Sequence, residues 1–120
     1  MLRALIFSLA ALLPFGAQAN PVLLMAEEAG CYWCARWDEE IAHIYPKTAE
    51  GRAVPLQRYD LHGDLPNVDL EKRVRFTPTF ILVKDGRELG RIEGYPGEDF
   101  FWSLLTMMFE DAGIGLENDS

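Results

Sequence analysis

Apolar and polar positions change their period several times along the chain after residue 20, and each change marks a strand or a helix. Short runs of branched and aromatic residues are typical of strands, whereas apolar residues three and four positions apart indicate helices. We expect strands at 22–25, 54–61, 80–83 and 87–93. We expect helices from the first cysteine to about residue 45, at 66–75 and at 98–110.

The apolar residues of each predicted helix share one side, which gives the helix a face for the core. These faces carry Trp37, Ile41 and Ile44, then Leu70 and Val74, then Phe101, Leu104, Leu105 and Met108. Asp85-Gly86 predicts a hairpin turn between the last two strands, and Pro46 predicts the end of the first helix. The order of elements predicts an α/β fold with one four-stranded mixed sheet and helices on both faces.

The first 19 residues have the pattern of a secretory signal peptide. Arg3 is their only charge, an apolar run of ten residues follows at Ala4–Leu13, and Ala17-Gln18-Ala19 has the small residues of a cleavage site. The run is shorter than the roughly 20 residues that a membrane span needs. An uncleaved anchor and a buried helix are the alternatives. We expect cleavage after Ala19 and export to a bacterial periplasm.

The remaining chain is long enough for one domain, which we place at 20–110. Residues 111–120 are acidic, contain two glycines and show no period, so we expect a flexible acidic tail. The formal net charge of −8 gives the chain little attraction for nucleic acid or for anionic lipid. We expect a monomer that binds no nucleic acid.

The only two cysteines, Cys31 and Cys34, lie where a predicted strand gives way to a helix. Free N–H groups and the dipole at the start of a helix favour an anion, so Cys31 should ionise more readily than a free cysteine. Cys34 lies one turn further on the same side, close enough for a disulfide. The pattern favours thiol–disulfide exchange, in which Cys31 attacks a partner's disulfide and Cys34 resolves the mixed disulfide.

Two other interpretations use the same cysteines. A structural disulfide is common in exported proteins, but closing so small a loop removes little chain entropy. A zinc site with His43 and His62 would need four ligands, often in close pairs, and these histidines are 19 residues apart. We therefore expect no metal and no cofactor other than the redox-active disulfide.

The chain resembles the thioredoxin superfamily in Cys31-Tyr32-Trp33-Cys34, in Phe76-Thr77-Pro78-Thr79-Phe80, and in the Asp85-Gly86 turn and Gly94 that follow. The resemblance implies the thioredoxin fold in its minimal form and a thiol–disulfide oxidoreductase. It also implies that Pro78 follows a cis peptide bond and faces the cysteine pair. The backbone of Thr77 would then pair with an incoming extended polypeptide.

The run Arg91–Phe101, together with the two motifs above, is similar to small periplasmic thioredoxins associated with bacterial thiosulfate oxidation. That resemblance implies a reductant that keeps the reactive cysteine of a sulfur-carrier protein free of disulfides. It also implies a membrane electron-transfer protein as the electron donor. The alternatives are an oxidase or isomerase of folding proteins, and a binding module with a structural or metal-holding cysteine pair.

Several positions depart from ordinary thioredoxins. Tyr32 and Trp33 replace Gly-Pro, and we predict an exposed apolar rim that packs on a protein partner, with one ring turned into the core as the alternative. The usual buried acid and its lysine partner fall on Met25 and about Leu56, so the usual proton relay is missing. Glu27 or Glu28 could substitute, although surface solvation is their simpler role. Glu39 stands where a proline is usual, which predicts a straighter first helix.

Overall fold

The computed structural model describes residues 20–116, and the predicted signal peptide at 1–19 lies outside these residues. Four strands form one sheet in the order β2-β1-β3-β4. They are β1 (Val22–Glu27), β2 (Leu56–Asp60), β3 (Thr79–Lys84) and β4 (Arg87–Glu93). β1 and β2 are parallel and the other two pairs are antiparallel. The predicted strands and the mixed four-stranded sheet are confirmed.

The helical part of the chain is more broken than the sequence predicted. α1 (Tyr32–Trp37) continues into a π-helical turn at Asp38–Ala42, and a 3-10 turn follows at Tyr45–Lys47. A short helix, α2 (Ala49–Ala53), precedes β2 and was not predicted. The last helix, α3 (Glu98–Asp111), lies where the sequence placed it.

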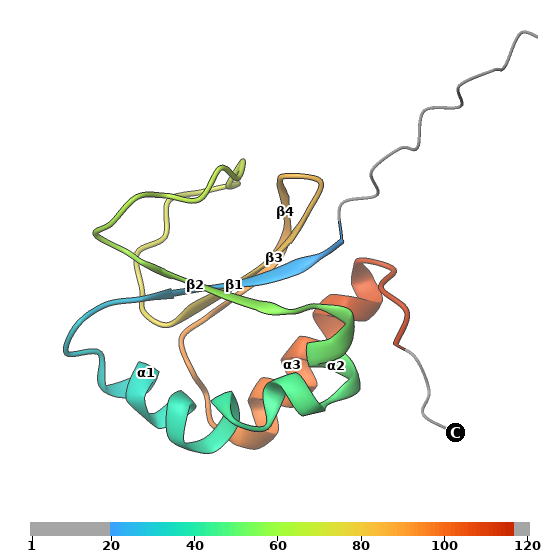
Figure 1. Ribbon diagram of the computed structural model, residues 1–120, viewed down its shortest axis with the longest axis horizontal. Helices are drawn as coiled ribbons and strands as arrows, with labels where there is room; N and C mark the ends of the chain where they lie inside the picture. The colour runs from blue at the N-terminus through green and yellow to red at the C-terminus, as the bar shows by residue number, and fades with distance from the viewer. Residues whose placement is uncertain (1–19, 117–120) are drawn as a thin grey trace, which may run out of the picture.

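All three helices cover the same face of the sheet, and the described helices leave the other face to irregular chain (Figure 1). Trp37, Phe80 and Phe101 are fully buried on the helical side, with ring centroids 5.0–5.9 Å apart. Two members of the predicted helix faces are instead exposed, Ile44 at 37% and Leu104 at 38%. Because the described helices all lie on one side of the sheet, the prediction of helices on both faces is wrong.

The helix predicted at 66–75 is absent, because backbone groups near its middle bond to the β3–β4 hairpin. The Asp69 N–H donates to the Gly86 carbonyl at 2.8 Å, and the Glu88 N–H donates to the Asp69 carbonyl at 3.1 Å. The Glu71 N–H donates to the Glu88 carboxylate at 3.3 Å. Groups that pair with a strand edge are not free for the i→i−4 bonds of a helix.

The irregular segment still covers the second face of the sheet. Val74 is buried there against Leu24 and Ile81, with Leu70 half-buried beside them. The predicted apolar spacing of Leu70 and Val74 therefore gave the right burial and the wrong secondary structure.

The C-terminal end packs further than the predicted domain boundary at residue 110. α3 ends at Asp111, and Ile114 and Leu116 pack against the main core. Residues 117–120 of the predicted tail lie outside the described residues. Within 20–116, no helix is both long enough and apolar enough to cross a membrane.

Candidate active site

The cysteine pair lies at the junction of β1 and α1, where the sequence placed it. Cys31 is the N-cap residue of α1, and Cys31 and Cys34 form a disulfide with Cα atoms 5.2 Å apart. Cys34 is only 5% exposed and belongs to the main core, whereas Cys31 is half-buried at its edge. An incoming molecule therefore meets Cys31 first.

The backbone around the pair suits a thiolate. The Cys34 N–H donates to Cys31 Sγ at 3.1 Å, and the Ala35 N–H donates to the Cys31 carbonyl at 3.2 Å. In the reduced protein the Cys34 N–H and the start of the helix stabilise negative charge on Cys31 Sγ. This arrangement supports nucleophilic attack by Cys31 and resolution by the buried Cys34.

Tyr32 and Trp33 form an aromatic surface beside Cys31. Tyr32 is 65% exposed and Trp33 is 53% exposed. Their rings meet edge to face, with centroids 4.9 Å apart at 83°. Neither ring turns into the core, and their part in partner binding stays a prediction.

The loop before β3 is tied to the cysteine loop. The Thr77–Pro78 peptide bond is cis, as the resemblance implied, and the Pro78 carbonyl accepts from the Gly94 N–H at 2.7 Å. Thr77 Oγ1 donates to Glu28 Oε1 at 2.7 Å. The Glu28 carbonyl in turn accepts from the Cys31 N–H at 3.3 Å. The structure thus brings Thr77 and Cys31 together through one residue, Glu28.

Glu28 has a larger role than the surface solvation that the sequence favoured. Its second carboxylate oxygen lies 2.7 Å from His62 Nε2, so one side chain joins three segments of the chain. The hydrogen bond from Thr77, then the one from His62, lowers the pKa of Glu28 below its usual value. In the sequence, only the position of Glu28 just before the cysteine pair pointed to a role in the site, because its partners Thr77 and His62 are far away along the chain.

The site lacks the usual buried acid and its lysine, as the sequence indicated. Met25 is fully buried and Leu56 is half-buried. Glu27 accepts from Arg58 at 2.8 Å, while Arg58 also pairs with Asp38 and lies 5.5 Å from the Trp37 ring centroid. Glu27 is therefore part of a surface ion-pair network.

A metal site has no support in the geometry. Residues 20–116 contain no group of three or more His, Cys, Asp or Glu side chains that could hold a metal ion. His62 bonds to Glu28, and His43 is exposed after the π-helical turn.

Comparison with known proteins agrees with this geometry. The family of the thioredoxin-like domain matches residues 10–108. The crystal structure of the reduced periplasmic thioredoxin SoxS from Paracoccus pantotrophus is 53% identical and superposes with a TM-score of 0.75, covering 77% of this chain and 98% of that one. No curated protein sequence matches the chain significantly.

More distant thioredoxins share the fold alone. Thioredoxin of Fasciola hepatica is 20% identical with a TM-score of 0.55, over 76% of this chain and 83% of that one. Thioredoxin of Malassezia sympodialis is 18% identical with a TM-score of 0.53, over 76% of each chain. With a redox disulfide at the start of α1 and a family match along most of its length, the chain belongs to the thioredoxin-like family and is a thiol–disulfide oxidoreductase.

Proposed function

We propose that the protein is an exported reductant that removes disulfides from a periplasmic partner protein. The observation that carries the proposal is the unequal exposure of the pair, with Cys31 accessible and Cys34 buried. A protein disulfide can reach Cys31, whereas Cys34 can attack only the bond that Cys31 has made. The 53% identity to the periplasmic thioredoxin SoxS supports export. A role in sulfur oxidation is what the resemblance of the run Arg91–Phe101 to thioredoxins of thiosulfate oxidation implies.

The reaction uses the two thiols of the reduced protein as a two-electron donor. The Cys31 thiolate attacks one sulfur of the partner's disulfide, which forms a mixed disulfide and releases one partner thiolate. Cys34 then loses its proton and attacks Cys31 Sγ, which releases the second partner thiolate and closes the Cys31–Cys34 disulfide. A membrane thiol reductase returns two electrons and two protons to this disulfide.

The surrounding residues bind the partner. The exposed rings of Tyr32 and Trp33 provide an apolar contact beside the reacting sulfur, and the backbone of Thr77, next to Pro78, pairs with the extended partner chain. The partner that fits the resemblance is a sulfur-carrier protein whose reactive cysteine must stay reduced. The protein works as a monomer after cleavage behind Ala19.

A trapping experiment tests the partner. Replacing Cys34→Ala leaves Cys31 joined to the protein it attacks, and the trapped partner can be identified from the periplasm. We expect one dominant sulfur-carrier protein, and no adduct with the control Cys31→Ala. Recovery of many unrelated secreted proteins would favour an oxidase or isomerase instead.

The reduction potential tests the direction of electron flow. A reductant requires a reduction potential well below that of strong disulfide oxidants, which is about −120 mV. Equilibration of the Cys31–Cys34 disulfide with glutathione gives this value. A result near the strong-oxidant end would reject the reductant function. Sequencing the N-terminus of the exported protein should give Asn20 as the first residue.

A further inference from the structure

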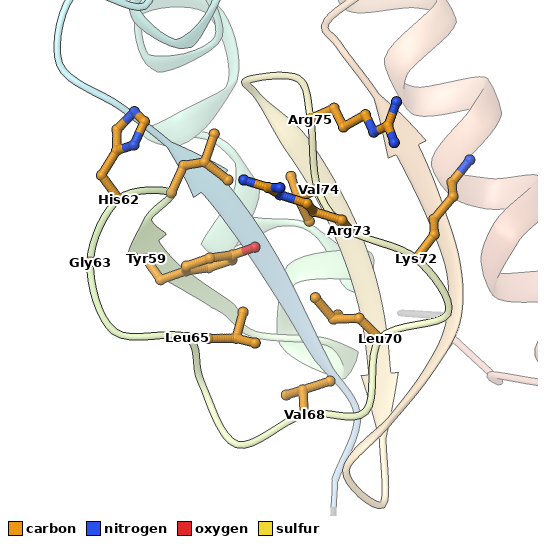
Figure 2. A pocket seen from close by; sticks show the side chains of 11 residues that line it. Tyr59, His62, Gly63, Leu65, Val68, Leu70, Lys72, Arg73, Val74 and Arg75 are labelled. Atoms are coloured by element: carbon orange, nitrogen blue, oxygen red, sulfur yellow. The ribbon is translucent and has the colours of Figure 1, made fainter.

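The face of the sheet without helices carries a pocket that the redox chemistry does not use. Its volume is about 830 Å³, within the range of about 300–1,000 Å³ that is usual for ligand sites. It lies between the end of β2 and the irregular segment that follows (Figure 2). Five apolar side chains line it, namely Leu61, Leu65, Val68, Leu70 and Val74.

Two polar groups in the pocket have no hydrogen-bonding or ionic partner among residues 20–116. The Tyr59 hydroxyl oxygen is buried and makes no hydrogen bond with any described residue. Arg73 is exposed and forms no ion pair with residues 20–116. In Figure 2, Arg73 extends across the pocket above Tyr59, whereas Lys72 and Arg75 point away from it. A donor hydroxyl and an unpaired guanidinium over an apolar floor suit a carboxylate attached to an apolar body.

The pocket is linked to the active-site loops through one side chain, His62. His62 lines the pocket and also lies 2.7 Å from Glu28 Oε2. Glu28 accepts from Thr77 Oγ1, which belongs to the loop of the cis-proline. Leu65, on the pocket's wall, is 57% exposed, as expected of a contact surface for another chain. The pocket therefore lies next to a segment that is bonded, through Glu28, to the loop of the cis-proline.

We propose that this pocket binds an acidic, apolar segment of the partner protein that carries the disulfide. A partner carboxylate pairs with Arg73 and the Tyr59 hydroxyl, while neighbouring apolar side chains fill the space between Leu65 and Val74. The inference rests on the proposed function, since it names the chemistry of the partner's chain around its disulfide. The whole protein is acidic, with a net charge of −8, and would repel such a segment if Arg73 did not attract it.

The test compares two synthetic peptides, each with one internal disulfide. One carries an extension of alternating Leu and Asp, and the other carries Lys in place of Asp. Stopped-flow fluorescence gives the second-order rate constant with which the reduced protein reduces each peptide. We expect the Asp peptide to react about threefold faster or more, although net charge alone favours the Lys peptide. Equal rates, or a faster Lys peptide, would overturn the proposal.

Matched variants assign the effect to the pocket. Arg73→Glu should abolish the preference for the Asp peptide, whereas Lys47→Glu makes the same change of charge on the helical side and should preserve it. Tyr59→Phe should reduce the preference. Hydroxyethyl disulfide, which is small and neutral, should react equally with all four proteins. If Arg73→Glu and Lys47→Glu behave alike, the pocket has no part in binding.

A binding measurement separates failure of this proposal from failure of the proposed function. An Asp peptide with Ser in place of its cysteines should shift the methyl NMR signals of Leu65 and Val68 in the oxidised protein. Shifts caused by octanoate but not by this peptide would make the pocket a site for a small carboxylate and overturn the proposal. A wild type that reduces neither hydroxyethyl disulfide nor insulin would instead contradict the reductant function, while these peptide shifts would still support the pocket.

Discussion

Glu28 is the side chain on which the geometry of the active-site loops depends. Its carboxylate accepts from Thr77 and contacts His62, and its carbonyl accepts from Cys31. Because both carboxylate contacts favour the ionised form, they lower the pKa of Glu28 in the folded protein. Folding and ionisation of this residue are therefore linked.

The linkage predicts a pH dependence for Glu28→Gln. A lowered pKa in the folded state contributes stability above the unfolded value of 4.5, and this contribution is lost as the pH falls through the folded value. The wild type should therefore be more stable than the variant at pH 6, and the difference should shrink below about pH 4.5. Urea unfolding at pH 6, 5, 4 and 3 measures this difference.

The control for this experiment is Glu110→Gln, an exposed carboxylate on α3. Its side chain makes no hydrogen bond or ion pair with residues 20–116, so this variant should not lose stability at pH 6. If Glu28→Gln follows the control, the contacts of Glu28 with Thr77 and His62 do not stabilise the folded protein in solution.

At the scale of single elements, the short helix α2 depends on a close backbone contact. Thr48 caps α2 by accepting from the Gly51 N–H at 3.0 Å, and the 3-10 turn before it presents the Tyr45 carbonyl to the helix. A Cβ at Gly51 would lie 1.8 Å from that carbonyl oxygen. The buried Tyr45 hydroxyl also donates to the Val54 carbonyl at 2.6 Å, which holds the two turns together.

Gly51→Ala should therefore destabilise the protein by about 2 kcal/mol or more, because the backbone of one turn must move away from the other. Gly63→Ala is the matched control, since a Cβ there meets its nearest neighbour at 3.4 Å and should change the stability by less than about 0.5 kcal/mol. Urea unfolding of the two variants gives both values. Similar stabilities would mean that α2 shifts freely.

The same elements show why the sequence predicted one helix correctly and another wrongly. α3 combines apolar spacing with Glu98 and Asp99 in its first turn, and its bonds are local, so the sequence contains what forms it. The segment 66–75 has apolar spacing at Leu70 and Val74, but its backbone bonds to β4. Such tertiary bonds leave no local signal. α2 was missed because five residues are too few to show a helical period.

In the active site, too, the sequence predicted the features that lie in short motifs and missed the contacts between distant residues. The cysteine pair, its place at a helix start and the cis-proline loop lie in short motifs, and the structure agrees with each. The contact of Glu28 with His62 joins residues 34 positions apart, and its contact with Thr77 joins residues 49 positions apart. No pattern in the sequence reports contacts of this length.

At the scale of the whole molecule, the two faces of the sheet are built differently. Three helices pack on one face around a continuous aromatic core, while an irregular segment closes the other (Figure 1). Besides the backbone bonds of Asp69, a buried ion pair helps to fix that segment to the sheet, because Glu88 accepts from Arg91 at 2.6 and 2.8 Å and also from the Glu71 N–H. The side chains of Glu88 and Arg91 are only 2% and 8% exposed.

Removing this ion pair should destabilise the face covered by the irregular segment more than the face covered by the helices. Glu88→Gln leaves the nearly buried Arg91 without its closest carboxylate, which should cost about 3 kcal/mol. The amides of Asp69 and Glu71, which are protected by β4, should then exchange hydrogen much faster, and those of α3 should change only as far as global stability falls. Hydrogen exchange followed by NMR measures each amide separately.

The comparison variant is Glu93→Gln, on the same strand. Glu93 is 35% exposed, pairs with Lys72 at 3.1 Å and lies 3.8 Å from Arg91 Nη1. Because Arg91 keeps its closer partner Glu88, the loss of Glu93 should cost less than about 1 kcal/mol and leave Asp69 protected. If Glu88→Gln instead raises exchange equally in α3 and in the segment 69–72, the two faces unfold as one unit. A selective effect would mean that the pocket beside Arg73 lies on the part of the molecule that opens most readily, where a partner's chain can be admitted without disturbing the cysteine pair.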